Sequence, residues 1–441
     1  MRRLLLIVLG ILVAALGAVA PSRTAAPTAA ASTEGARCNG SHWVADWYAP
    51  PGDALLAQPT VEQTFRIQVA PTHGGSVARF RLSNRFGHGP VTFGAATVGQ
   101  QDPVAGGPVV EDGTLRQLTF AGSRSVTVPK GREVVSDPVR LRVRPFHVLL
   151  VSVHVVGSPG PPTQHAIAEQ TTWQTPPLSG DHTADDGTHG FVALPLPGVT
   201  PSLPENIPYL AGMDVRAPRR VGSVVTFGDS ITDGTQASFV PVLLTPTNVD
   251  EFQSYPEHLA RRILRRGLPF AVANAGLSGN MLLKDAAVPV FGPAGLSRFP
   301  VDALARSGAT TVILLEGIND IGQGLASRDD LVAGYRATIA AAHERGLRVL
   351  LGTLTPQNGT IQPPRYGAPG EPTRVEVNRW IRGQHVADGV VDFDRAVRDP
   401  ADPSRIRPAY DGGDHLHFSP AGYKAMAAAV PLRLLARPAC R

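Results

Sequence analysis

Residues 224–232 read VVTFGDSIT, a short apolar run followed at once by small and polar residues. The run is typical of a buried strand, and Gly-Asp-Ser is typical of the turn after it. Such a turn exposes the Ser230 hydroxyl and leaves its backbone N–H free to face a reacting group. Ser230 is therefore a candidate nucleophile, although a serine that caps a helix or forms an ordinary turn has the same local pattern.

Downstream of this segment, apolar runs alternate with helical stretches. The runs lie at residues 270–273, 311–316, 348–354 and 390–393. Ser254 and Glu257 form a capping box, residues 329–344 have one apolar face, and Ser419 opens the last helix. Strand and helix in alternation predict a parallel sheet with helices on both faces, over residues 217–441.

Upstream, the hydrophobic pattern has a period of two. Residues 78–82 read ARFRL, in which apolar and charged side chains alternate, and further short apolar runs are separated by Gly, Pro and Asp. Almost no stretch has helical periodicity. We therefore expect an antiparallel β-sandwich or jelly roll over residues 38–216, with the boundary to the next domain at residues 217–220.

The N-terminus has the layout of a secretory signal peptide. Arg2 and Arg3 precede an apolar run from Leu4 to Ala20, and an Ala/Pro/Thr-rich segment continues to residue 32. Residues 1–32 are thus expected to direct export, and the mature protein to be extracellular. An uncleaved membrane anchor is the competing interpretation, because the run has about 17 residues, the short limit for a bilayer span.

The chain contains two cysteines, Cys38 and Cys440. In an exported protein the compartment is oxidising, so we predict a disulfide that joins the two ends of the mature chain. Two free thiols are the alternative.

Composition excludes several classes of protein. The 441 residues are 43% hydrophobic and 17% charged, which is globular and long enough for two or three domains. The net charge of +5 includes Arg2, Arg3 and Arg23 of the expected leader. No cluster of Lys and Arg with interleaved aromatic residues occurs, so no nucleic-acid partner is expected.

Three further segments carry residues suited to ester chemistry. Gly279 lies in a glycine-containing turn after the second expected strand, where a backbone N–H can approach a ligand closely, although an ordinary tight turn has the same local pattern. Asn319 follows the third strand and can present its side-chain amide to an oxyanion, or else cap a helix. Asp414 and His417 are spaced so that the carboxylate can orient the imidazole for a serine nucleophile. His415 and His417 could instead be read as metal ligands, but no matching third ligand lies nearby in sequence.

Together these four segments resemble the SGNH, or GDSL, hydrolase family, whose characteristic Ser, Gly, Asn and His occur in this order. The resemblance covers residues 221–441 and implies a three-layer, flavodoxin-like α/β domain. It implies that Ser230 is the nucleophile, His417 the general base and Asp414 its orienting carboxylate. The oxyanion hole would consist of the Ser230 and Gly279 N–H groups and the Asn319 side chain.

The whole chain is similar to a secreted bacterial, mostly actinobacterial, subgroup in which a β-rich domain precedes the hydrolase domain. The segments at 82–87, 135–139 and 413–417 carry this similarity. It implies a serine ester hydrolase that removes short acyl groups, most notably acetyl, from carbohydrate, with no metal or organic cofactor. A lipase or phospholipase, an acyltransferase, and a glycan-binding protein with an inactive hydrolase domain are the alternatives.

Overall fold

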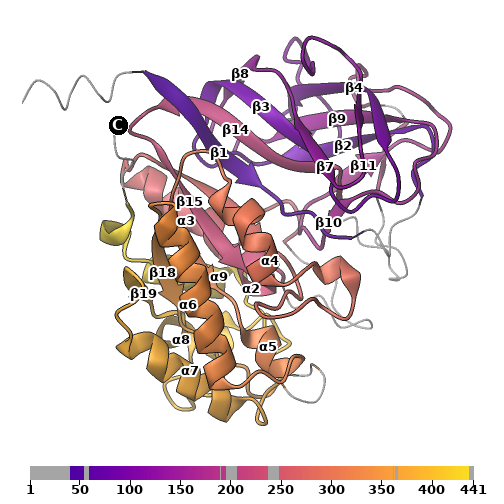
Figure 1. Cartoon of the computed structure of the whole chain (residues 1–441). Coiled ribbons are helices and arrows are strands. Elements are labelled where there is room, and N and C mark those ends of the chain that lie inside the picture. The colour runs from indigo at the N-terminus through magenta and orange to yellow at the C-terminus, as the bar shows by residue number, and fades with distance from the viewer. Residues whose placement is uncertain are drawn as a thin grey trace, which may run out of the picture.

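The computed structural model describes residues 40–53, 59–188, 190–194, 206–236, 248–360, 362 and 366–436. The expected signal peptide, Cys38 and Cys440 lie outside these residues. Two regions follow one another along the chain, a β-rich region above and an α/β region below in Figure 1.

The N-terminal region is an antiparallel sandwich. One sheet has the order β1-β14-β3-β7, with β8 also paired to β3, and the other has the order β12-β11-β2-β9-β4-β5, with β6 paired to β4. The strands of the first sheet are β1 (Ser41–Tyr48), β3 (Gly75–Asn84), β7 (Arg132–Val135), β8 (Val139–Val143) and β14 (Leu210–Pro218). Those of the second are β2 (Gln63–Val69), β4 (Val91–Gln100), β5 (Arg116–Gln117), β6 (Val126–Val128), β9 (Leu149–Val156), β11 (Thr172–Gln174) and β12 (Val192–Ala193).

The alternation seen in the sequence accounts for this packing. Ala78, Phe80 and Leu82 of β3 are fully buried and meet Phe65 and Ile67 of β2 in one core between the sheets. A separate pair of short strands, β10 (Gln164–Ala166) and β13 (Asn206–Pro208), lies below the sandwich. The predicted sandwich is thus confirmed.

The C-terminal region is built on a five-stranded parallel sheet. Its order is β16-β15-β17-β18-β19, which is the flavodoxin-like order in which the first strand lies between the second and the third. The strands are β15 (Gly222–Gly228), β16 (Phe270–Gly276), β17 (Ala309–Leu315), β18 (Arg348–Gly352) and β19 (Gly389–Val391). All five overlap the apolar runs expected from the sequence, and the last strand ends two residues before the expected run does.

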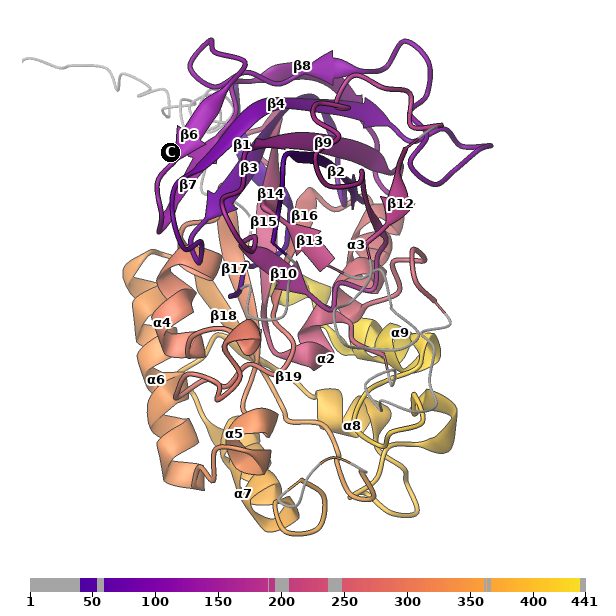
Figure 2. The ribbon, with the colours of Figure 1, turned by 90° about the vertical axis from the view of Figure 1, so that its right-hand side faces the viewer.

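Helices cover both faces of this sheet, and Figure 2 shows the two layers on either side of it. One layer contains α3 (Tyr255–Arg265), α8 (Phe393–Val397) and α9 (Pro420–Ala429). The other contains α4 (Gly295–Phe299), α6 (Arg328–Glu344) and α7 (Glu371–Gly383), while the short α2 (Ser230–Asp233) and α5 (Ile318–Gly322) follow β15 and β17. The predicted capping box of Ser254 and Glu257 starts α3, and Ser419 caps α9.

The β-rich region protects an edge of the parallel sheet. β16 is an edge strand, and its Val272 N–H donates to Thr72 Oγ1 at 2.9 Å. Beneath β1, the Ser223 hydroxyl donates to Ala45 O at 2.8 Å. An ion pair between the half-buried Arg85 and the buried Asp302, at 2.6 Å, links the two regions further. Because an exposed edge strand invites pairing with other chains, this contact also removes a site of aggregation.

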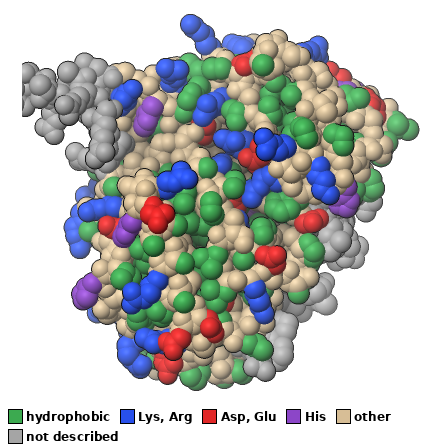
Figure 3. Space-filling view, viewed as in Figure 1, with side chains coloured by type: hydrophobic (Ala, Val, Ile, Leu, Met, Phe, Trp, Pro, Cys, Tyr) green, Lys and Arg blue, Asp and Glu red, His purple; other side chains and the backbone are tan. Residues whose placement is uncertain are grey.

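The surface has no single dominant charge on the face that Figure 3 shows, where Lys and Arg are interspersed with Asp and Glu. Within the described ranges, no helix combines the length and the apolar character needed to cross a lipid bilayer.

Candidate active site

The four segments singled out in the sequence meet at the carboxyl ends of the parallel strands. Ser230 follows β15 directly, Gly279 lies in the loop after β16, and Asn319 lies in α5 after β17. His417 and Asp414 come from the loop before α9. In a flavodoxin-like sheet the connections on either side of the first strand run in opposite directions, so a crevice opens at this point. The fold therefore brings together residues separated by up to 187 positions.

Ser230, His417 and Asp414 form one chain of hydrogen bonds. Ser230 Oγ lies 2.9 Å from His417 Nε2, and His417 Nδ1 lies 2.6 Å from Asp414 Oδ2. The other carboxylate oxygen of Asp414 accepts from the backbone N–H groups of Leu416 and His417, at 3.0 and 2.8 Å. Asp414 is thus held from both sides, and His417 has one carboxylate and one hydroxyl partner.

The charges in this chain suit proton transfer. Burial alone would raise the pKa of Asp414, but the His417 charge and hydrogen bonds lower that pKa well below its ordinary value. Burial alone would lower the pKa of His417, whereas Asp414 raises it above its ordinary value of 6.5. An ionised Asp414 requires the proton on Nδ1, which leaves the Nε2 lone pair of neutral His417 facing the Ser230 hydroxyl. In this tautomer His417 can take the Ser230 proton.

The local structure shows that Ser230 is not a helix cap. Asp229 is the N-cap of α2, and its carboxylate accepts from the Ile231 N–H at 2.9 Å. Burial raises the pKa of Asp229 to about 7. Because Asp229 performs the capping, the Ser230 side chain is available to His417. Its own N–H lies in the first turn, where it has no partner within the helix.

Asn319 presents a fixed amide to the same crevice. Its Nδ2 donates to Asn280 O at 2.8 Å, and its Oδ1 accepts from the Tyr366 hydroxyl at 2.5 Å. Gln323 in turn donates to the Tyr366 hydroxyl at 2.7 Å. The cap of α5 is Gly317, so Asn319 does not cap this helix through its side chain. Its second N–H is free of these contacts and can serve an oxyanion.

The surroundings of position 279 require a glycine. Its φ is +75°, and a Cβ at this position would lie 2.4 Å from the ring of Phe291. Both the backbone conformation and the close approach therefore exclude a side chain. Its backbone can come close to a ligand in the crevice.

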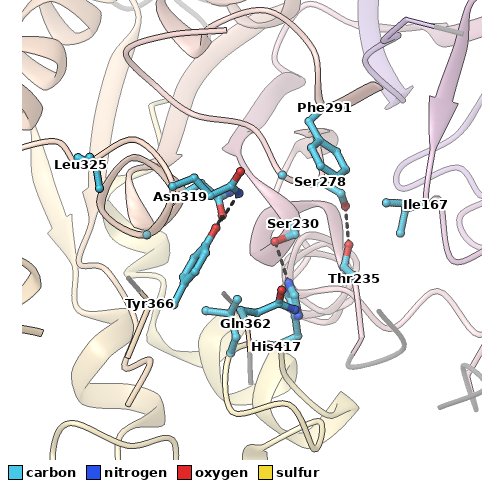
Figure 4. Close-up of a pocket in the computed structure, with 14 residues that line it drawn as sticks. Ile167, Ser230, Thr235, Ser278, Phe291, Asn319, Leu325, Gln362, Tyr366 and His417 are labelled. Atoms are coloured by element: carbon cyan, nitrogen blue, oxygen red, sulfur yellow. Dashed lines mark hydrogen bonds between the residues drawn. The ribbon is translucent and has the colours of Figure 1, made fainter. Parts of the chain in front are cut away.

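The crevice is a pocket with a volume of about 560 Å³. Figure 4 shows Ser230 and His417 on one side, Asn319 and Tyr366 on another, and Phe291 and Ile167 beyond Ser278. Its wall is largely apolar and includes Ile167, Phe291, Leu325, Tyr366 and Leu416. Ile167 belongs to the β-rich region, so both regions line the pocket.

A buried arginine holds the strand ends under the pocket. Arg298, only 1% exposed, donates to Gly228 O at 2.8 Å and to Ala275 O at 2.9 Å. Its Nε donates to Asn280 Oδ1 at 2.7 Å. One side chain thus ties the ends of β15 and β16 to the loop that carries Gly279.

The two neighbouring histidines have different partners. His417 points to Ser230, whereas the His415 ring bonds the Asp411 carboxylate and is partly exposed. The two rings therefore do not form a ligand pair, which disfavours the alternative of a metal site.

Several residues at the site were not expected from the sequence. Arg298, Tyr366 and Ile167 lie in no recognisable motif. His165 of the β-rich region and Asp233 line a small cavity other than the pocket of Ser230, and His165 Nε2 lies 3.1 Å from Asp233 Oδ1. Asp233 stands three residues after Ser230, and this proximity was the only signal that could have drawn attention to it.

Comparison with known proteins identifies one matching family. Residues 226–425 match the model of the GDSL-like lipase/acylhydrolase family. No curated protein sequence matches this chain.

Solved structures similar to this chain include three from bacteria. An aryl esterase of M. smegmatis has 19% identity and a TM-score of 0.39, covering 49% of this chain and 100% of its own. A carbohydrate acetylesterase of Sinorhizobium meliloti has 18% identity and a TM-score of 0.37, covering 47% of this chain and 95% of its own. A GDSL-like lipase of Bacteroides thetaiotaomicron has 17% identity and a TM-score of 0.34, covering 48% of this chain and 87% of its own.

The family match covers the end of β15, the other four strands of the parallel sheet and all four segments at the strand ends. We conclude that residues 226–425 form a domain of the GDSL-like lipase/acylhydrolase family and that this chain is a carboxylic ester hydrolase.

Proposed function

We propose that this chain is a secreted serine esterase in which Ser230 is the nucleophile, His417 the general base and Asp414 the residue that orients His417. The observation that carries this proposal is the unbroken chain from Asp414 through His417 to Ser230, at 2.6 and 2.9 Å. It opens into a pocket that Asn319 and Gly279 also line.

The reaction proceeds in two halves. Ser230 Oγ attacks the ester carbonyl carbon while its proton passes to His417 Nε2, and the carbonyl oxygen becomes an oxyanion. The Ser230 and Gly279 N–H groups and Asn319 Nδ2 stabilise that charge. His417 then protonates the leaving alcohol, and an acyl group remains on Ser230. A water molecule, deprotonated by His417, attacks the acyl carbon, and the carboxylic acid leaves as Oγ regains the proton.

The proposed substrates are short acyl esters, in particular acetyl groups on carbohydrate, as the sequence resemblance implies. Two amide side chains, Gln323 and Gln362, line the pocket and can bond sugar hydroxyls. The apolar wall favours a second candidate. Ile167, Phe291 and Leu325 supply a surface that an acetyl group does not need, and longer acyl chains would bury it.

Hydrolysis of nitrophenyl acetate, butyrate, octanoate and palmitate tests both candidates. We expect the purified protein to cleave at least one of these esters and Ser230→Ala to be inactive on all of them. Fastest cleavage of acetate supports carbohydrate deacetylation, which acetylated xylan then tests directly. Fastest cleavage of the long chains supports the lipase candidate.

Product analysis in the presence of an alcohol distinguishes hydrolysis from acyl transfer. An active Ser230→Ala variant would contradict the assignment of the nucleophile. If the wild type were also inert on every ester, the glycan-binding alternative would be favoured.

A further inference from the structure

One segment of the β-rich region reaches the active site of the other region. β10 carries His165, and Ile167 follows it into the wall of the pocket. Figure 2 shows β10 between the sandwich and α2, the helix that begins with Ser230. His165 is 3% exposed, so its polar atoms depend on protein partners.

Both ring nitrogens of His165 face acceptors. Nδ1 lies 2.9 Å from the carbonyl oxygen of Pro50, and Nε2 lies 3.1 Å from Asp233 Oδ1. A carbonyl oxygen and an ionised carboxylate can accept a hydrogen bond but cannot donate one. A proton on Nε2 lets His165 donate to Asp233, and a second proton on Nδ1 lets the ring donate to the Pro50 carbonyl oxygen as well.

The surrounding charges agree with this state. Burial and the nearby Arg298 lower the pKa of His165, but Asp233 and the Pro50 carbonyl raise it above its ordinary value. Glu257 lines the same small cavity as His165 and Asp233.

Asp233 links His165 to the loop that carries Gly279. Its second oxygen, Oδ2, accepts from the Ser278 N–H at 3.0 Å and from the Ser278 hydroxyl at 2.7 Å. Ser278 Oγ also lies 2.5 Å from Thr235 Oγ1. Ser278 directly precedes Gly279, so these bonds hold the backbone N–H and the side chain of the residue next to the Gly279 N–H.

We propose that His165 is a positioning residue for ester hydrolysis: its Nε2–H group holds the Asp233 carboxylate, which holds Ser278 and thereby aims the Gly279 N–H at the oxyanion. This inference rests on the proposed function, because it assigns Gly279 a role in the same site. It also gives the β-rich region a part in catalysis.

Two substitutions of the same chemical kind separate this role from simple packing. The amide nitrogen of His165→Gln reaches the place of Nε2 and keeps a donor for Asp233. The amide nitrogen of His165→Asn takes the place of Nδ1, so it keeps the bond to Pro50 O and loses Asp233. A polar cavity of about 50 Å³ adjoins His165 and Asp233, and water can fill the space that either variant leaves.

We expect His165→Asn to lower kcat by about 10- to 100-fold with KM changed by less than about twofold, since a misaimed donor acts on the transition state. His165→Gln should keep kcat within about threefold of the wild type, because the donor to Asp233 remains. Thermal unfolding of both variants shows whether a loss of activity merely follows a loss of stability.

Equal kcat values for the two variants, or losses that track Tm, would overturn the inference. Should His165→Asn fail to fold, Asp233→Ala replaces it. This variant removes the acceptor of the Ser278 N–H and hydroxyl groups, so kcat should fall about 10-fold or more, and a kcat within about twofold of the wild type would contradict us. Ser230→Ala, assayed alongside, separates the two proposals. If it is active, the proposed function fails, and if it is inactive while the His165 variants are alike, only this inference fails.

Discussion

Replacing Asn319 by alanine tests the oxyanion hole directly. The Asn319 side chain is 3% exposed and its amide plane is set by two bonds, from Nδ2 to Asn280 O and from the Tyr366 hydroxyl to Oδ1. One N–H of Nδ2 remains for the substrate. The alanine variant removes this donor and leaves Ser230 and His417 in place.

We expect the alanine variant to lose activity because it lacks one hydrogen-bond donor to the oxyanion in a site sheltered from water. Such a donor contributes about 100- to 1,000-fold to kcat, or about 2.7–4 kcal/mol. KM should change little, because the charge on the carbonyl oxygen develops only in the transition state. The substitution also leaves Asn280 O without the Asn319 donor and the Tyr366 hydroxyl without its acceptor, although Gln323 still donates to that hydroxyl. The lost bonds cost about 1–3 kcal/mol of folding free energy and lower Tm.

The assay is the initial rate of nitrophenyl acetate hydrolysis, measured well below the Tm of every variant. Tyr366→Phe is the matched control, since it removes a neighbour of the Asn319 amide and keeps the donor itself. We expect it to lose less than about 10-fold in kcat, the value of one neutral hydrogen bond. A folded Asn319→Ala variant with kcat within about threefold of the wild type would remove Asn319 from the oxyanion hole.

Three further predictions concern the base and the pocket wall. The pKa of His417 is raised, and only its neutral form accepts a proton, so kcat/KM should fall as pH decreases through a midpoint above 6.5. A profile without this acidic limb would contradict the assignment of the base. Asp414→Asn should lower kcat by about 10,000-fold, because the amide favours the wrong tautomer, and should shift that midpoint to lower pH. Steady-state rates across pH measure both effects, and unchanged turnover would show that Asp414 does not orient the base. Ile167→Ala should lower kcat/KM for octanoate by about 10-fold relative to acetate, through lost apolar contact. An unchanged ratio would mean that the acyl chain lies elsewhere.

Much of the fold could be predicted because its signals are local. The alternation at residues 78–82 predicts a half-buried strand, and Phe80 and Leu82 are indeed in the core of the sandwich. The capping box of Ser254 and Glu257 depends on residues three positions apart, and the helix begins there. Such patterns need no knowledge of the rest of the chain.

The candidate site residues could be predicted for a related reason. Ser230, Gly279 and Asn319 each follow an apolar strand, and parallel strands deliver their carboxyl ends to one edge of the sheet. Asp414 and His417 are close in sequence, so their contact is nearly a local one. The order of these residues along the chain then indicated the family.

By itself, the amino-acid sequence determined the two classes of sheet, the helix starts and the set of residues brought to the strand ends, since all of these depend on periodicity and short spacings. Only the tertiary structure decided how the β-rich region meets the site. Arg298 binds carbonyl groups on β15 and β16, and His165 contacts Asp233 across 68 positions. Contacts of this kind join buried polar atoms of residues that are far apart in the sequence, and they form only when the two surfaces dock. No local sequence pattern encodes the distance between such atoms.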